Sequence, residues 1–185
     1  MTISVTAPFS ADIAQGLRAG DSVNLSGFIY TARDAAHLLM RDALLAGREL
    51  PFDVRGQTLF YAGPTPAPLG RPIGSIGPTT SSRMDFATPL LLKAGMRAMV
   101  GKGSRSENVI KAIAQYGAVY FAAVGGAAAL MAGCVLSAEV IAYPELGTEA
   151  VSLLHVKDLP IIVAVDCLGN DYYTQGPKRF LNIHN

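Results

Sequence analysis

The sequence predicts an α/β fold in which a mixed sheet is layered with helices. Strand-like and helix-like segments alternate through the second half of the 185-residue chain, and such alternation indicates parallel strands joined by helices. Half of the residues are hydrophobic and 16% are charged, a balance typical of one packed globular body. No repeat or linker interrupts the sequence, so we expect a single domain over residues 1–185.

The first half contains one clear strand and one clear helix, followed by short strands between loops rich in Pro and Gly. Residues 23–29 alternate apolar with polar side chains, which predicts a strand with one buried face. The four residues from Thr31 are similar to a capping box, so we expect a helix from there to a stop at Gly47. Short strands are predicted at residues 59–62 and 72–76.

The second half is more regular. Thr88 and Pro89 are typical of the N-cap and first position of a helix, which Gly95 would end. A turn or short helix is expected near residues 144–150, and the chain after Asp171 has only a weak pattern. The remaining predicted elements are strands at residues 96–100, 119–124, 135–143 and 161–166, and helices at residues 106–116 and 126–132.

Composition disfavours several classes of partner. The formal net charge is +1 and Lys and Arg form no block, which argues against nucleic acid. Residues 117–138 carry no charge, but their four glycines and many alanines favour a buried strand, turn and helix over a membrane span. The N-terminus lacks the basic region and apolar core of a signal peptide, so we expect a cytoplasmic protein.

The cysteines and histidines predict no metal site within this chain. Cys134 and Cys167 lie in apolar surroundings without Cys-x-x-Cys spacing, as expected of small buried hydrophobic residues. Two thiols are also too few for the usual ligand set of an iron–sulfur cluster. His37, His155 and His184 lack metal-ligand spacing, and structural roles are expected for all three.

The run from residue 74 to residue 85 is the strongest candidate for a functional site. Its hydroxyl side chains at residues 79–82 stand directly before Arg83, after a Gly-Pro turn. Backbone N–H groups, hydroxyl donors and a guanidinium within a few residues suit a bound anion. Ser and Thr also cap ordinary helices, so composition alone leaves a plain helix start as an equal alternative.

Two further cations are candidates for the same anion site. Lys102 lies between Gly101 and Gly103, which keep its ammonium accessible, although the phosphate-loop pattern is absent and a plain loop is an alternative. Arg33 stands at the start of a predicted helix, where the helix dipole disfavours a cation unless an anion binds nearby or Asp34 pairs with it. A solvated surface arginine is the alternative for Arg33.

Taken together, these segments resemble the β subunit, or C-terminal domain, of the iron–sulfur-dependent class I fumarate hydratases. The resemblance extends from about residue 20 to residue 173, and β subunits of tartrate dehydratase are similar. Its most specific part is the sequence Gly-Pro-Thr-Thr-Ser-x-Arg-Met-Asp that ends at Asp85. The matching segments are residues 25–27, 30–37, 61–64, 74–85, 101–103, 123–130 and 166–171.

The resemblance implies a swivelling β/β/α domain and a hydro-lyase that reversibly hydrates fumarate to (S)-malate. It implies that Arg33, Arg83 and Lys102 bind the substrate carboxylates, with Thr79 as catalytic base beside Arg83. A guanidinium suits a carboxylate because it meets two oxygens at once. The family's four-iron four-sulfur cluster is bound by cysteines of a partner α subunit and not by this chain, so the resemblance implies a hetero-oligomer whose β subunit is inactive alone.

Two alternatives stay open at this stage. One is the β subunit of L-tartrate dehydratase or of a related 2-hydroxy-acid dehydratase, with the same chemistry on another substrate. The other is a non-catalytic anion-binding or scaffold subunit that retains the fold of the family but not its activity.

Overall fold

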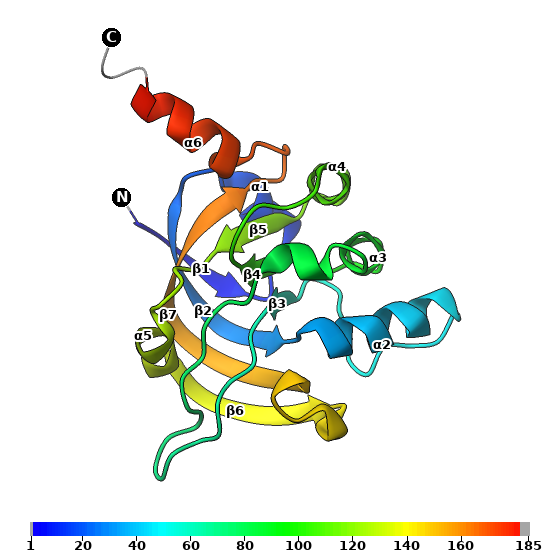
Figure 1. The fold of residues 1–185 in the computed structure, drawn as a ribbon. Helices are drawn as coiled ribbons and strands as arrows, with labels where there is room; N and C mark the ends of the chain where they lie inside the picture. Colours follow the sequence, from blue (N-terminus) through cyan, green and yellow to red (C-terminus); the bar gives the residue numbers. More distant parts are fainter. Residues whose placement is uncertain (1, 182–185) are drawn as a thin grey trace.

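The structure is a computed structural model that describes residues 2–181. One curved sheet of seven strands has the order β1-β2-β3-β4-β5-β7-β6, with helices against it (Figure 1). Strands β1 to β5 pair with one another in parallel, whereas β7 pairs antiparallel with β2, β5 and β6. The strands are β1 (Thr2–Ala7), β2 (Ser22–Thr31), β3 (Thr58–Phe60), β4 (Ala98–Gly101), β5 (Val119–Ala122), β6 (Val135–Ala142) and β7 (Val151–Val165). The predicted α/β class, a mixed sheet layered with helices, is confirmed.

Strand β7 closes the sheet into a ring. It pairs with β5 near its carboxyl end and with β2 along most of its length, so β2, β3, β4, β5 and β7 form a closed circuit. The prediction of a strand at residues 161–166 was therefore too short, because Lys157, Asp158 and Pro160 interrupt the apolar pattern. Asp158 has a positive φ of 53° and lies where the β2–β7 register shifts, so a bulge absorbs the interruption.

Three helices lie together along one face of the sheet (Figure 1). These are α2 (Asp34–Leu45), α3 (Thr88–Lys93) and α4 (Glu107–Tyr116). The other helical elements are α1 (Ala11–Gly16), α5 (Ala128–Gly133), α6 (Tyr172–Leu181) and the 3₁₀ turns η1 (Ser81–Met84) and η2 (Pro144–Glu149). The sequence pattern did not predict β1, α1 or α6.

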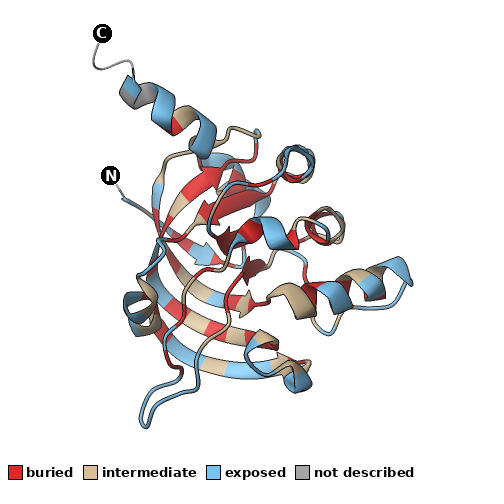
Figure 2. Cartoon of the chain, in the orientation of Figure 1, coloured by how far each residue is buried: buried red, intermediate tan, exposed pale blue. Residues whose placement is uncertain are grey.

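The central strands are buried on both faces (Figure 2). Phe60 and Phe121 belong to a core that also contains residues of β1, α1 and α5, while Tyr61, Met99 and Tyr120 point into a second core beneath α2, α3 and α4. Strands covered on both faces are expected to be mainly apolar, as β3, β4 and β5 are, although β3 begins with the buried Thr58.

Several predicted elements are confirmed. Helix α4 ends at Gly117 in the left-handed conformation, and the Gly47 amide donates to the Leu44 carbonyl just beyond α2. The uncharged segment at residues 117–138 contains β5, a turn, α5 and the start of β6. No helix among residues 2–181 is long and apolar enough to cross a membrane.

Two predicted helix starts were wrong. Thr31 does not cap α2 but ends β2, where its hydroxyl oxygen accepts a hydrogen bond from the Ser152 amide of β7 at 3.3 Å. Arg33 is the N-cap residue of α2 and makes no capping bond with its side chain. Thr88 is the first residue of α3 instead of its cap, and its hydroxyl donates to the Met84 carbonyl at 2.9 Å. The Thr31 hydroxyl is therefore bound to a distant strand and the Thr88 hydroxyl to the preceding turn, so neither caps its helix.

The strand predicted at residues 72–76 was also wrong. This segment folds back on its own loop, because the Thr65 amide donates to the Ser75 carbonyl and the Gly74 amide donates to the Thr65 carbonyl. Prolines in the loop lack the N–H groups that a strand ladder needs. Ile73 and Ile76 are nevertheless buried, which accounts for the strand-like apolar pattern.

We expect Gly27→Ala to destabilise the fold. Gly27 has φ of 103°, and an added Cβ would lie 2.5 Å from the Ala7 carbonyl oxygen on β1. The free energy of unfolding in urea should fall by at least about 2 kcal/mol. In the control Gly16→Ala, an added Cβ meets no atom within 4 Å, and stability should be unchanged or slightly higher. Equal stability of the two variants would contradict this account of the β1–β2 contact.

Candidate active site

The four predicted site residues gather at the carboxyl-terminal edge of the parallel strands. Arg33 follows β2, and Lys102 follows β4. Thr80 forms a parallel bridge with Lys102, and the Ser81 amide donates to the Lys102 carbonyl at 2.9 Å. The Thr79 amide donates to the carbonyl of Tyr61, directly after β3, at 2.7 Å. The hydroxyl run therefore lies across the ends of β3 and β4, where α/β folds usually bind ligands.

Arg83 lies against the Thr79 hydroxyl. Arg83 lies in η1 and Thr79 lies two residues before this turn, and Arg83 Nη1 donates to Thr79 Oγ1 at 3.3 Å. Arg83 Nε is 2.7 Å from Asp34 Oδ1 at the start of α2, which orients the guanidinium. A fixed positive charge beside a hydroxyl favours its deprotonated form.

Arg33 is held by two carboxylates. Its Nη2 is 3.3 Å from Glu149 Oε1 of η2, and its Nε is 3.8 Å from Asp34 Oδ2. The second Glu149 oxygen accepts from the Ala35 amide at 3.0 Å, so Glu149 also caps α2. Pairing with Asp34, one of the ways in which the Arg33 charge could be offset, is therefore observed, and Asp34 also joins the two guanidiniums.

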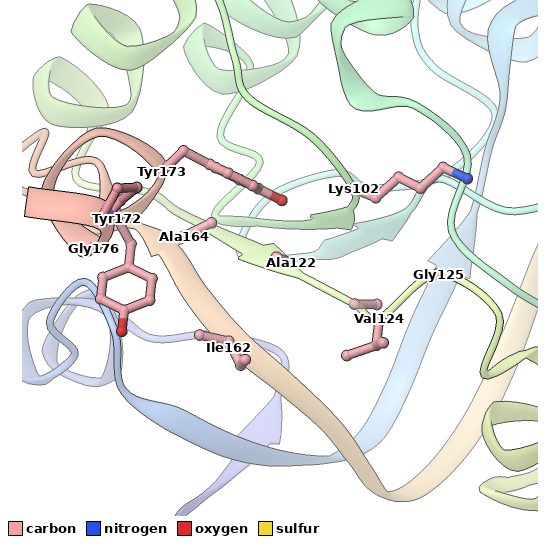
Figure 3. A pocket seen from close by; sticks show the side chains of 11 residues that line it. Lys102, Ala122, Val124, Gly125, Ile162, Ala164, Tyr172, Tyr173 and Gly176 are labelled. Carbon is pink, nitrogen blue, oxygen red and sulfur yellow. The ribbon is translucent and has the colours of Figure 1, made fainter. Parts of the chain in front are cut away.

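Lys102 is exposed, as Arg83 is, but it differs from both arginines in having no carboxylate partner among residues 2–181. It makes no ion pair within the described part of the chain. Its side chain runs over the turn after β5, with Cδ 4.0 Å from the point where a Cβ of Gly125 would lie. Figure 3 shows the ammonium pointing away from Tyr172 and Tyr173, along the rim of an apolar cavity of about 560 Å³ between β5, β7 and α6. The charge of Lys102 is therefore available to a ligand.

A buried arginine fastens the hydroxyl run to the loop that carries Lys102. Arg105 Nε donates to Asp85 Oδ1 at 2.8 Å, and Nη2 donates to Thr88 Oγ1 at 2.8 Å. The guanidinium lies over the rings of Tyr61 and Tyr120, at 5.3 and 5.0 Å from their centroids. These contacts satisfy a charge whose side chain is fully buried, and they explain why it is tolerated there.

Tyr120 makes a second connection between the same two segments. Its hydroxyl lies 2.9 Å from Ser81 Oγ and 2.8 Å from the Gly103 carbonyl oxygen. Burial raises the pKa of Tyr120, so the phenol stays protonated and acts as a donor. Gly101 has no room for a side chain, because a Cβ there would collide with Ser81.

His37 lies beneath Arg33 and does not open onto the site. Its Nδ1 is 2.8 Å from the Arg33 carbonyl oxygen, which can only accept, so this nitrogen carries the proton. The ring packs edge-on against Tyr61, with centroids 5.1 Å apart. Burial lowers the pKa of His37 to about 4, with the Arg105 charge adding to the effect. His155 stacks on Phe28, and His184 lies outside the described residues.

Comparison with known proteins decides the family. The sequence profile described as "Fumarase C-terminus" matches residues 1–176. The chain belongs to this family. It is 41% identical over 155 residues to "Fumarate hydratase class I, anaerobic" of Escherichia coli (strain K12), a match that covers 83% of this chain and 28% of that protein. The predicted resemblance is therefore confirmed, and the chain spans just over a quarter of the length of that relative.

Two further members of the family extend the comparison. The chain is 41% identical over 169 residues to "Putative L(+)-tartrate dehydratase subunit beta" of Methanocaldococcus jannaschii, covering 88% of this chain and 87% of that subunit. It is 34% identical over 184 residues to "Putative fumarate hydratase class I" of Geobacillus stearothermophilus, covering 97% of this chain and 35% of that protein. Relatives therefore occur both as separate subunits and as parts of longer chains.

The described residues of this family member do not fit an iron–sulfur cluster. Cys134 follows α5 and Cys167 follows β7, and both thiols are free. Within residues 2–181, no three His, Cys, Asp or Glu side chains gather in a way that could hold a metal ion. A four-iron cluster is normally held by several Cys thiolates, which these residues do not offer.

Three residues of the site carry no signal in the sequence that would identify them. Glu149 reaches Arg33 across more than a hundred positions, so only folding brings the two together. Arg105 and Tyr120 act from within the core, and a single Arg before a helix carries no distinctive sequence signal. The one available hint was that Arg105 follows the Gly-Lys-Gly sequence closely in a chain with few charges.

We expect stability to fall with acidification because of His37. Its pKa drops from 6.5 in the unfolded chain to about 4 in the folded one, so the unfolded state binds more protons between these values. Above pH 6.5, His37 is neutral in both states and its burial does not reduce the free energy of unfolding. As the pH falls towards 4, protonation of the unfolded state lowers this free energy. The free energy of unfolding should decrease by about 3 kcal/mol over this range through His37.

Urea unfolding at several pH values measures this effect. His37→Gln should remove most of the slope between pH 6.5 and 4, whereas the control His155→Gln, on β7, should keep it. An unchanged slope in His37→Gln would contradict the buried neutral imidazole.

Proposed function

We propose that this chain is the β-type part of an iron–sulfur hydro-lyase that reversibly adds water to fumarate to give (S)-malate. One observation carries the proposal: Thr79 and three cations meet at one edge of the sheet, with Arg83 bonded to Thr79 Oγ1 at 3.3 Å. The names of the family's fumarate hydratase relatives support the reaction class.

The three cations are assigned to the two carboxylates of the substrate. Asp34 and Glu149 balance the charges of Arg33 and Arg83, and Lys102 supplies an unbalanced positive charge. Arg83 uses Nε for Asp34 and Nη1 for Thr79, which leaves Nη2 for a ligand oxygen. Fixed guanidiniums lose little entropy on binding and therefore favour a planar dicarboxylate.

Thr79 is assigned as the base of the reaction. As the alkoxide, its Oγ1 would take a proton from the methylene carbon of malate while the hydroxyl group leaves the neighbouring carbon as hydroxide, and hydration would run the same step in reverse. A neutral threonine hydroxyl is a weak base, so this role needs the alkoxide. The Arg83 guanidinium next to Thr79 Oγ1 would stabilise that alkoxide. Arg83 thus serves both the substrate and the base.

A partner is required for the complete site. We assign the four-iron four-sulfur cluster to cysteines of an α subunit, because the described residues of this chain do not offer its ligands. The "subunit beta" in the name of the Methanocaldococcus jannaschii relative supports a hetero-oligomer. On this assignment the isolated chain is inactive.

The second candidate is the same type of elimination on L-tartrate. It is favoured by the match to a putative tartrate dehydratase subunit over 87% of that subunit's length. Tartrate carries one more hydroxyl than malate, so it needs a further hydrogen-bond partner near the cations. A non-catalytic scaffold is the alternative of a different class.

Anaerobic co-expression with the α subunit tests the proposal. The complex, loaded with its cluster, should consume fumarate, followed by loss of its ultraviolet absorbance, and should turn over tartrate more slowly. Faster turnover of tartrate would select the second candidate. A complex that holds its cluster and turns over neither compound would contradict both enzymatic functions.

Thr79→Ala should lower kcat in that complex by about a hundredfold or more, because it removes the proton acceptor. KM should change little, since the cations that bind the carboxylates remain. Ser82→Ala is the matched control: Ser82 is an exposed hydroxyl of the same run and should behave like the wild type. Wild-type turnover by Thr79→Ala would eliminate the proposed base.

Arg83→Lys should raise KM for fumarate by about tenfold, because an ammonium cannot bind Asp34, Thr79 and a carboxylate oxygen at once. Its kcat should also fall, since the Thr79 hydroxyl loses its donor. Steady-state kinetics over a range of fumarate concentrations separates the two effects. An unaltered KM would show that Arg83 does not bind the substrate.

A further inference from the structure

The Gly-Lys-Gly loop starts at Gly101, the last residue of β4, and at Gly103 it contains little that fixes its own position. Gly103 has φ of 82°, and a Cβ added to it would meet no atom within 4 Å. A glycine directly after Lys102 leaves the backbone there with more freedom than another residue would allow. A loop of this kind must be held by hydrogen bonds if Lys102 is to occupy one place.

Three of these hydrogen bonds come from neighbouring parts of the sheet and core. The Gly101 carbonyl accepts from the Ala123 amide at 2.8 Å, and the Lys102 carbonyl accepts from the Ser81 amide at 2.9 Å. The Gly103 carbonyl lies 2.8 Å from the Tyr120 hydroxyl. Each carbonyl of the loop therefore has a donor.

The fourth hydrogen bond comes from the C-terminal helix. The Gly103 amide donates to the hydroxyl oxygen of Tyr173 on α6 at 2.9 Å. Figure 3 shows the Tyr173 side chain extending from α6 towards the Lys102 loop, over the apolar cavity. Tyr173 is 41% exposed, so packing alone does not explain its orientation.

Asp171 fixes the end of α6 from which Tyr173 projects. Its Oδ1 accepts from the Tyr173 amide at 2.9 Å, and its Oδ2 accepts from the Thr174 hydroxyl at 2.7 Å. Asp171 also forms a bridge with Val165 at the end of β7. The helix start is thus anchored to the same sheet that carries Lys102.

We propose that Tyr173 is a positioning residue for Lys102: its hydroxyl binds the Gly103 amide and so sets where the Lys102 ammonium meets a substrate carboxylate. This inference rests on the proposed function, in which Lys102 binds substrate. It gives α6 a role in positioning Lys102, although no residue of α6 belongs to the carboxylate-binding group.

Tyr173→Phe tests the inference by removing one oxygen and keeping the ring. In the complex with the α subunit, KM for fumarate should rise by about three- to tenfold, the size expected for one lost hydrogen bond, with kcat changed by less than about twofold. Tyr116→Phe is the matched control, since the Tyr116 hydroxyl makes no hydrogen bond within residues 2–181, and its KM should stay at the wild-type value.

A double-mutant cycle separates positioning from general stability. In a Lys102→Gln background, Tyr173→Phe should raise KM no further, because there is no ammonium left to position. An equal rise of KM in both backgrounds, an unchanged KM in the single variant, or a joint loss of kcat and thermal stability would overturn the inference.

Amide hydrogen exchange of Gly103, measured by NMR on the chain by itself, gives a readout that does not need activity. Exchange should be about tenfold faster in Tyr173→Phe than in the wild type. Unchanged exchange would overturn the inference. If the wild-type complex consumes no dicarboxylate, the proposed function fails, and the exchange at Gly103 then decides whether Tyr173 holds the loop.

Discussion

The parallel pairing of β2, β3, β4 and β5 is the constraint on which the rest of the structure depends. Parallel strands place their carboxyl ends at one edge, so the residues that follow them become neighbours whatever their separation in the sequence. Arg33 and Lys102 meet the hydroxyl run for this reason. Strand β7 makes the arrangement rigid, because it pairs with both β2 and β5 and closes the ring.

Charge pairing then sets the directions of the side chains. Asp34 lies between the guanidiniums of Arg33 and Arg83, and it turns Arg83 towards Thr79. A buried pair such as Arg105–Asp85 contributes little net stability, since desolvation opposes its attraction. Its geometric effect is larger here, because it joins the end of the hydroxyl run to the segment after Lys102.

The sequence predicted the fold class and the chemically distinctive residues, but not the contacts that orient them. Arg83 and Thr79 lie four residues apart in one motif, so their proximity is local and follows from the sequence. Glu149 lies just before β7 and Tyr173 lies after it, so the pairing of β7 with the sheet places both residues. The polar residues around the bulge at Asp158 interrupt the apolar pattern, and the sequence therefore predicted only the end of β7. Thr31 was mistaken for a cap because local hydroxyl chemistry looks the same whether the partner is the next helix or the distant Ser152 amide.

Binding of a dicarboxylate at the strand ends is the central claim, and a crystal structure of the complex with the α subunit and a bound dicarboxylate tests it most directly. One carboxylate is expected within hydrogen-bond distance of Arg33 or Arg83 and the other near Lys102, with Thr79 Oγ1 facing the carbon chain between them. A dicarboxylate bound away from these residues, for example in the apolar cavity beneath α6, would contradict this claim.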